Sequence, residues 1–264
     1  MKKRYIVLVW LLMLAVFCGA KTGSANEATP QIIQDELYDK AMALKEEGNN
    51  NGALDVLKKI MDENLSKDVL KYTDALIEQC MIMKDANNPV WKTRAIDASQ
   101  KVKMLYRTNF TNPEYWLVYA KFSALVNKER HVNGAFKKAF YFKPDFIKGY
   151  IVKGDLYYYL AKNMDPSSSY TSSSITGETT ETNDKSNSPR YVAGINARDA
   201  YSVAVNSSTL DNKKKSSLFY KLGELEFIIL SNKPAAISNW EKAVELDAES
   251  VYGKRAKERL TIPQ

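Results

Sequence analysis

The stretch that decides the fold covers residues 216–246 and reads SSLFYKLGELEFIILSNKPAAISNWEKAVEL. Apolar residues recur every three or four positions in each half of it, which is the spacing of one face of an α-helix. Pro234 and the polar residues before it divide the halves, and proline is well tolerated in the first turn of a helix. Gly223, Ala236 and Ala243 are small enough to let two helices approach closely. The stretch therefore predicts a tight helical hairpin.

The order of small and aromatic residues in this hairpin resembles the tetratricopeptide repeat. That family places an aromatic residue, Leu-Gly, Ala, a second aromatic residue and Ala within about 34 residues. The matching residues here are Phe219, Leu222, Gly223, Ala236, Trp240 and Ala243. The resemblance implies an all-α fold, a right-handed helical solenoid in which helix-turn-helix repeats pack on their neighbours.

The same register continues along the chain. The position of Gly223 is filled by Ala41, Ala75, Ala120 and Gly154, and that of Ala243 by Ile60, Leu105, Ala139 and Ala204. We therefore expect one helical domain over residues 32–264, with about five helix-turn-helix repeats and a C-terminal capping helix. A Ser/Thr-rich tract, residues 166–190, interrupts the fourth repeat. We expect this insert to be disordered, because it has too few apolar side chains to bury.

The first 25 residues have the pattern of a signal peptide. Lys2, Lys3 and Arg4 precede an unbroken apolar run, and small residues follow that run. The run is short for a membrane span, so we expect cleavage after Ala20 or Ala25 and export, with a periplasmic location. A polar lead, residues 26–31, then precedes the helical domain. A retained signal anchor is the alternative.

Cys18 offers a further alternative, because a cysteine at the end of such a run can be the lipidated first residue of a lipoprotein. Phe17, directly before it, departs from the small residue that this processing normally requires. A lipid chain would tether the domain at a membrane surface.

Removal of the signal peptide changes what the charge and the cysteines imply. The first 25 residues hold four basic and no acidic residues, so cleavage lowers the formal net charge of +7 by four. The basic balance is then weak evidence for a nucleic-acid partner, and we expect none. Cys80 remains as a single cysteine without an internal disulfide partner, and its apolar neighbours predict a buried, inert thiol.

The sequence carries no recognisable catalytic motif. A nucleophile elbow, a phosphate-binding loop and a zinc-protease helix are all missing, and the single histidine, His131, cannot make a usual zinc site with one cysteine. We therefore expect neither catalysis nor a cofactor nor a metal.

The resemblance also implies where a partner would bind. Solenoids of this family bind along the concave surface that is made by the first helix of each repeat, called the first helices below. Carrying the register over predicts a partner-binding groove lined by Tyr38, Tyr72, Leu76, Leu117, Lys121, Ile151, Asp155, Tyr158, Tyr159, Tyr220, Glu224 and Phe227. Aromatic side chains with polar tips suit such a surface. The alternative is that neighbouring repeats cover these positions.

The family's clamp for a peptide carboxylate is built from Lys and Asn on successive first helices. This clamp is missing here, which favours an apolar or aromatic ligand segment.

The first hypothesis is an exported, non-catalytic scaffold for a protein or peptide partner, with membrane contact only through a lipid anchor or a retained signal segment. Two alternatives are a repeat lipoprotein at the outer membrane that serves envelope assembly, and a transporter-associated subunit that holds a small molecule in the aromatic groove.

Overall fold

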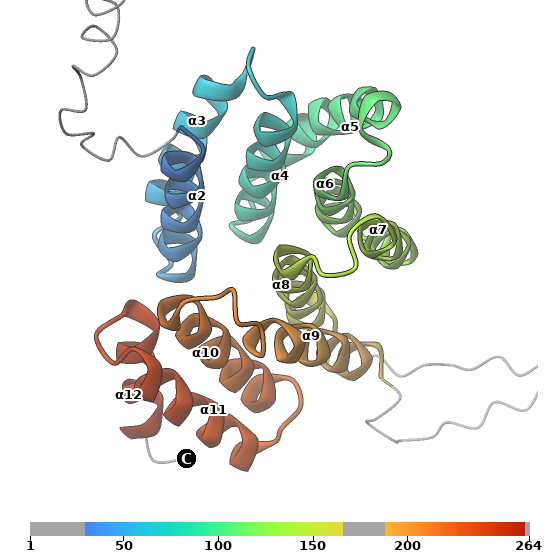
Figure 1. Ribbon diagram of the computed structural model, residues 1–264. Helices are drawn as coiled ribbons and strands as arrows, with labels where there is room; N and C mark the ends of the chain where they lie inside the picture. The colour runs from blue at the N-terminus through green and yellow to red at the C-terminus, as the bar shows by residue number, and fades with distance from the viewer. Residues whose placement is uncertain (1–29, 166–187, 262–264) are drawn as a thin grey trace, which may run out of the picture. The chain divides into compact units, whose positions relative to one another are not determined.

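The computed structural model describes residues 30–165 and 188–261, and every regular element among these residues is an α-helix. The expected signal peptide, Cys18 and most of the expected insert lie outside this part of the chain. The described helices are α2 (Pro30–Glu46), α3 (Asn50–Asn64), α4 (Val69–Asp85), α5 (Val90–Asn109), α6 (Pro113–Leu125), α7 (Glu129–Phe142), α8 (Ile147–Asn163), α9 (Pro189–Val205), α10 (Asn212–Ile228), α11 (Lys233–Leu246) and α12 (Val251–Thr261) (Figure 1). In chain order they make five helix pairs and a terminal helix, which confirms the expected fold class.

The chain divides into two compact units, with the boundary between Ile60 and Met61 inside α3. In the first unit, Ala41, Ala53 and Leu57 are fully buried. Gly48 ends α2 with a positive φ of 76°, a conformation that costs glycine little because it has no Cβ. This glycine turns the chain from α2 into α3.

In the second unit each helix pair packs as a hairpin, α4 with α5, α6 with α7, α8 with α9 and α10 with α11. Successive pairs then pack on one another, because α4 contacts α6, α6 contacts α8, α10 contacts α9, and α12 covers α10 and α11. Each pair thus contacts the next one along the chain, which is the packing expected of stacked repeats.

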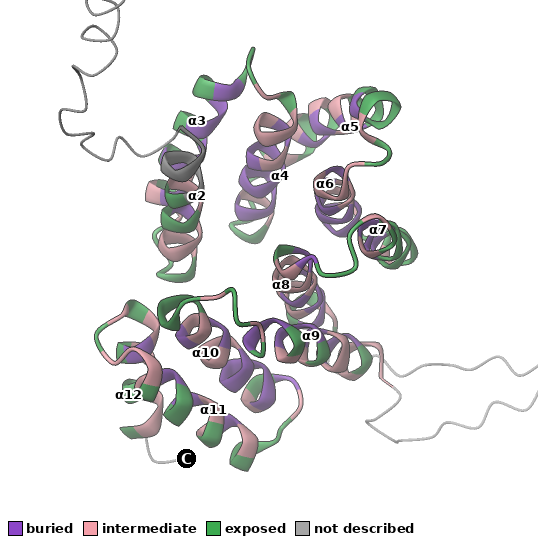
Figure 2. Ribbon diagram, viewed as in Figure 1, coloured by how far each residue is buried: buried purple, intermediate pink, exposed green. Residues whose placement is uncertain are grey.

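Small residues at the register positions are buried in the hairpins, as the register predicted. Ala75, Ala120, Gly154 and Gly223 are all buried, and so are their counterparts on the second helices. Figure 2 shows buried residues along the sides of the helices that face neighbouring helices. A Cβ atom at Gly154 would collide with the ring of Tyr201 on α9, and one at Gly223 with the ring of Trp240 on α11.

Two predicted boundaries are corrected by the helix ends. Helix α2 begins at Pro30, so residues 30 and 31 are helical and do not belong to the polar lead. Helix α9 begins at Pro189, and the side chain of Ser188 caps it by accepting a hydrogen bond of 3.1 Å from the Tyr191 backbone N–H. Residues 189 and 190 are therefore helical, in contrast to the expected insert. No described helix is both long enough and apolar enough to cross a membrane.

Candidate functional site

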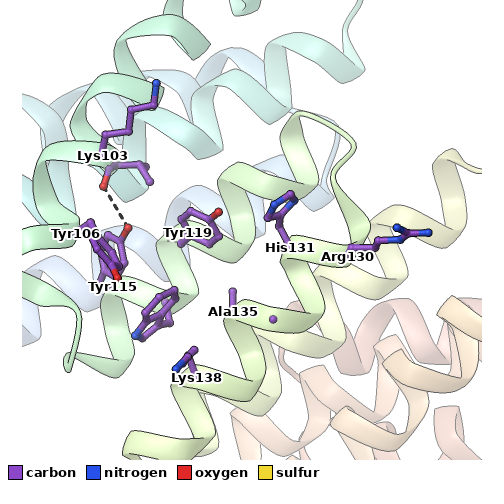
Figure 3. A pocket seen from close by; sticks show the side chains of 11 residues that line it. Lys103, Tyr106, Tyr115, Tyr119, Arg130, His131, Ala135 and Lys138 are labelled. Atoms are coloured by element: carbon purple, nitrogen blue, oxygen red, sulfur yellow. Dashed lines mark hydrogen bonds between the residues drawn. The ribbon is translucent and has the colours of Figure 1, made fainter.

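A cavity of about 510 Å³ lies in the second unit among helices α5, α6 and α7 (Figure 3). Each of the three helices contributes side chains to it. The lining residues are Val102, Lys103 and Tyr106 on α5, Tyr115, Trp116 and Tyr119 on α6, and Arg130, His131, Gly134, Ala135 and Lys138 on α7.

The aromatic side of the cavity is held rigidly by the protein's own hydrogen bonds. The hydroxyl of Tyr115 donates to the Val102 carbonyl over 3.2 Å, and the indole N–H of Trp116 donates to the Phe110 carbonyl over 2.8 Å. The rings of Tyr115 and Trp116 pack edge to face, with centroids 5.2 Å apart, and Tyr119 continues the cluster. Burial, reinforced by the neighbouring tyrosines, raises the pKa of Tyr115 to about 12, so this phenol stays neutral.

The other part of the lining is basic. Lys103, Arg130, His131 and Lys138 contribute to the lining, and the charged ends of Lys103 and Arg130 point away from the aromatic rings (Figure 3). The lining contains no carboxylate. All four side chains are exposed. The site therefore combines an apolar aromatic wall with a positive rim.

Sequence reasoning missed this cavity, because its walls come from three helices of two repeats. A signal was nevertheless present in residues 115–119 of α6. Tyr115 and Trp116 are neighbours, so they point roughly 100° apart and cannot both face the same core. Tyr115 is 1% exposed, whereas Trp116 is only partly buried and lines the cavity.

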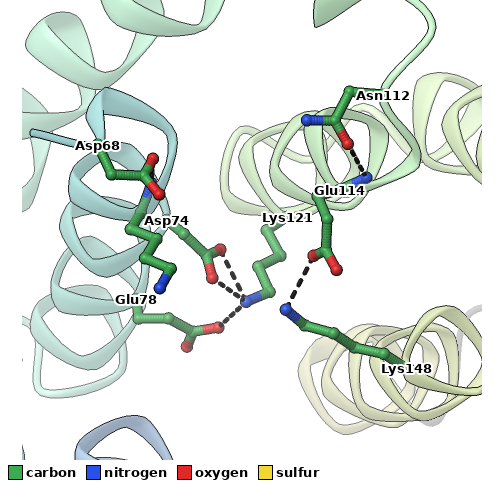
Figure 4. Close-up of polar contacts among 8 residues, drawn as sticks. Asp68, Asp74, Glu78, Asn112, Glu114, Lys121 and Lys148 are labelled. Carbon is green, nitrogen blue, oxygen red and sulfur yellow. Dashed lines mark hydrogen bonds and ion pairs between the residues drawn. The ribbon is translucent and has the colours of Figure 1, made fainter. Parts of the chain in front are cut away.

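The predicted groove residues fall into three groups: paired charged residues, buried apolar residues and partly exposed residues. The charged ones join first helices to one another. Lys121 on α6 is buried, and its ammonium lies 2.8 Å from Asp74 Oδ1 and 3.1 Å from Glu78 Oε1, both on α4 (Figure 4). Burial alone would lower the pKa of Lys121, but the two carboxylates outweigh burial and hold the pKa above its ordinary value.

Similar pairs continue along the first helices. Asp155 on α8 accepts hydrogen bonds from Lys221 on α10 over 2.8 Å and from the Tyr201 hydroxyl over 2.7 Å. Glu224 on α10 forms a bidentate pair with Arg259 on α12, at 2.8 and 2.7 Å. We call the ion pairs of Lys121 with Asp74 and Glu78, of Lys221 with Asp155 and of Arg259 with Glu224 the first-helix seam. The seam also includes the more exposed pair between Glu114 on α6 and Lys148 on α8 at 2.8 Å. The charges at three predicted groove positions are thus neutralised by neighbouring helices.

Several apolar members of the predicted groove are covered as well. Leu76 and Leu117 are each 2% exposed and belong to the core, so their assignment to an open groove is corrected. Tyr220 packs its ring 5.8 Å from that of Tyr252, and Phe227 lies 5.7 Å from Trp240. Both are partly buried against the core cluster around Trp240. At these positions neighbouring helices cover the side chains to a large extent.

The remaining members keep partial exposure. Tyr72 lies beneath the Lys101 ammonium, 4.9 Å from its ring centroid, and Ile151, Tyr158 and Tyr159 form part of α8. Burial, reinforced by Asp85 and Glu78, raises the pKa of Tyr159. Tyr38 is partly exposed in the first unit.

The structure also describes the surroundings of Cys80 and of the acidic and histidine side chains. Cys80 is fully buried, which confirms the expected burial, and burial raises the pKa of its thiol to about 11. Among the described residues no group of histidine, cysteine, aspartate and glutamate side chains is arranged to hold a metal ion.

The stacked hairpins and the pairs between them define a helical-repeat protein. The sequence matches no family model and no curated protein. Among solved structures the chain is similar to MamA protein, with 13% identical residues and a TM-score of 0.40, over 88% of this chain and 98% of that chain. A likeness of this degree supports no statement about function.

Proposed function

We propose that this protein is an exported, non-catalytic scaffold that binds a segment of another protein on the face made by its first helices. That face is the concave surface expected from the resemblance to the tetratricopeptide repeat. The observation that carries the proposal is the first-helix seam. It ties α4 to α6, α6 to α8, α8 to α10 and α10 to α12 through ion pairs.

The seam has two consequences for binding. Residues held by paired neighbours are pre-organised, so a ligand meets a surface that loses little conformational freedom on binding. The paired charges also leave the partly exposed residues Ile151 and Tyr158 as the main contacts on α8, whereas the hydroxyl of Tyr159 is buried. Such a face favours a partner segment with apolar or aromatic side chains, since aromatic anchors supply much of the binding energy in protein interfaces.

Affinity capture from the source cells tests this function through Tyr158. The Tyr158→Ala variant is expected to retain its helicity and to weaken partner capture by roughly 1–2 kcal/mol. Lys257→Ala, on the exposed side of α12, is the control and is expected to capture the partner normally. A folded Tyr158→Ala variant with unchanged capture would place the partner elsewhere.

The export half of the proposal has its own test in the mass of the mature N-terminus. We expect a start at Lys21 or Asn26 in the periplasmic fraction. A lipidated start at Cys18 would instead support the alternative, a membrane-tethered lipoprotein that serves envelope assembly.

A further inference from the structure

We infer that the cavity among α5, α6 and α7 is a second docking site, which takes an acidic peptide segment that inserts an aromatic side chain. The site is separate from the proposed binding face, because none of the predicted groove residues lines it. It therefore goes beyond the proposed function, and each site can fail while the other stands.

The size and the lining of the cavity favour an inserted apolar group. Its volume of about 510 Å³ falls within the range of sites that hold small organic groups. The polar atoms of Tyr115 and Trp116 are already bonded to backbone carbonyls, so these two rings offer mainly apolar surface to a ligand. Gly134 leaves one wall open, since a Cβ atom built there would meet nothing within 4 Å.

The charge of the lining favours acidic neighbours around that group. Within the described residues, no ion pair joins Lys103, Arg130 or Lys138 to a carboxylate, in contrast to the paired lysines of the seam. A positive rim without its own carboxylates attracts a negatively charged partner and accelerates its encounter. Aspartate or glutamate residues on either side of the inserted ring would meet this rim.

The arrangement of the rings favours a peptide over a single-stranded nucleic acid, which also combines negative charge with aromatic groups. Nucleic-acid grooves present ring faces on which successive bases stack. Here Trp116 stands at 82° to Tyr106 and at 73° to Tyr115 and Tyr119, so the rings pack edge to face and do not present a row of parallel faces. Such a cavity receives a single side chain more readily than a row of bases.

The test uses a short fluorescein-labelled peptide with one phenylalanine flanked by aspartates, titrated with the full mature chain and followed by fluorescence anisotropy. Replacement of the phenylalanine by alanine, or of the aspartates by asparagine, is expected to weaken binding roughly tenfold each. A labelled oligothymidine and free benzoate serve as competing probes for the nucleic-acid and small-molecule outcomes.

Two variants locate the site. Gly134→Leu fills the cavity from its open wall, and Lys138→Glu reverses one charge of the rim. Each is expected to weaken the peptide roughly tenfold. Lys137→Glu makes the same charge change on the neighbouring exposed position of α7, which does not line the cavity, and is expected to leave binding within about twofold.

Melting curves show whether the variants fold. If Gly134→Leu does not fold, the Lys138→Glu variant alone tests the site. The inference is overturned by an absence of peptide binding, or by equal loss in Lys137→Glu and Lys138→Glu. The inference is also overturned if oligothymidine binds more tightly than the peptide, or if benzoate binds and the peptide binds no more tightly than benzoate. Continued capture of the partner by the Lys138→Glu variant would show that the first-helix face works independently.

Discussion

Glycine at positions 154 and 223 allows the helices of two hairpins to come close together. The ring of Tyr201 occupies the space beside Gly154, and the ring of Trp240 occupies the space beside Gly223. Both rings are fully buried, so they cannot swing into solvent to make room for a larger residue. These two glycines are required by packing and not by backbone conformation.

We expect Gly223→Ala to lower the free energy of unfolding by roughly 1–3 kcal/mol, because the added methyl group overpacks the α10–α11 hairpin. Gly134→Ala is the matched control, since it also lies within a helix but has open space around it. There the gain in helix propensity is expected to raise stability by roughly 0.5–1 kcal/mol. Urea denaturation measures both, and a neutral or stabilising Gly223→Ala would contradict the packing.

At this scale the sequence predicted the buried small residues correctly but not the partners of the charged ones. Small residues at regular spacing reveal a packing register, because their positions depend on local helix geometry. The ion pairs of Lys121 with Asp74 and of Lys221 with Asp155 join residues 47 and 66 positions apart. Which charges meet across that separation depends on how the repeats stack, and no local pattern encodes it.

Between elements, the ion pairs of the seam differ greatly in their exposure to water. The side chains of Lys121, Asp74 and Glu78 are 7%, 20% and 8% exposed, whereas those of Lys148 and Glu114 are 58% and 39% exposed. Both sets join successive first helices. Their contributions to stability should differ, because water screens the exposed pair and solvates its members if it breaks.

We expect Lys121→Met to lower the free energy of unfolding by roughly 3 kcal/mol, since it leaves two carboxylates without their cation in a largely buried place. Lys148→Met makes the same change in the exposed pair and is expected to cost less than about 1 kcal/mol. Equal effects of the two substitutions in chemical denaturation would show that burial does not govern the seam.

The cavity shows why a site between elements escaped prediction. The register placed Ala120 of α6 at a close-packing position and assigned Leu117 and Lys121 of the same helix to a groove. The register does not indicate that residues of α5 and α7 share a cavity with α6. In the sequence His131 suggests only a zinc ligand, and one histidine with one cysteine cannot make a usual zinc site. Lys138 and Tyr106 come together at one cavity only because α5 and α7 flank α6.

At the scale of the whole molecule, buried tyrosines make stability depend on alkaline pH. Burial raises the pKa of Tyr115 and of Tyr157 to about 12 each, above the value of about 10 in an unfolded chain. A group whose pKa is raised by folding contributes to stability below its unfolded pKa, and the contribution is lost as pH rises towards the folded pKa. Lys121, whose pKa is also raised, acts in the same direction.

We therefore expect the free energy of unfolding to fall between about pH 10 and about pH 12. Just below about pH 10 these groups should change the free energy of unfolding little. Urea denaturation at a series of pH values measures this. The Tyr115→Phe variant should lose less stability over the window than the original chain. An unchanged slope in that variant would show that Tyr115 ionises equally in both states.

Photo-crosslinking from position 158 distinguishes a binding face on the first helices from any other use of this fold. A photoreactive phenylalanine analogue replaces Tyr158 in one strain and Lys257 in another, and both strains are irradiated with the protein in its native compartment. A protein adduct is expected from position 158 and not from position 257. Equal adducts from both positions, or an adduct from position 257 alone, would contradict a scaffold that binds its partner through the face tied together by the first-helix seam.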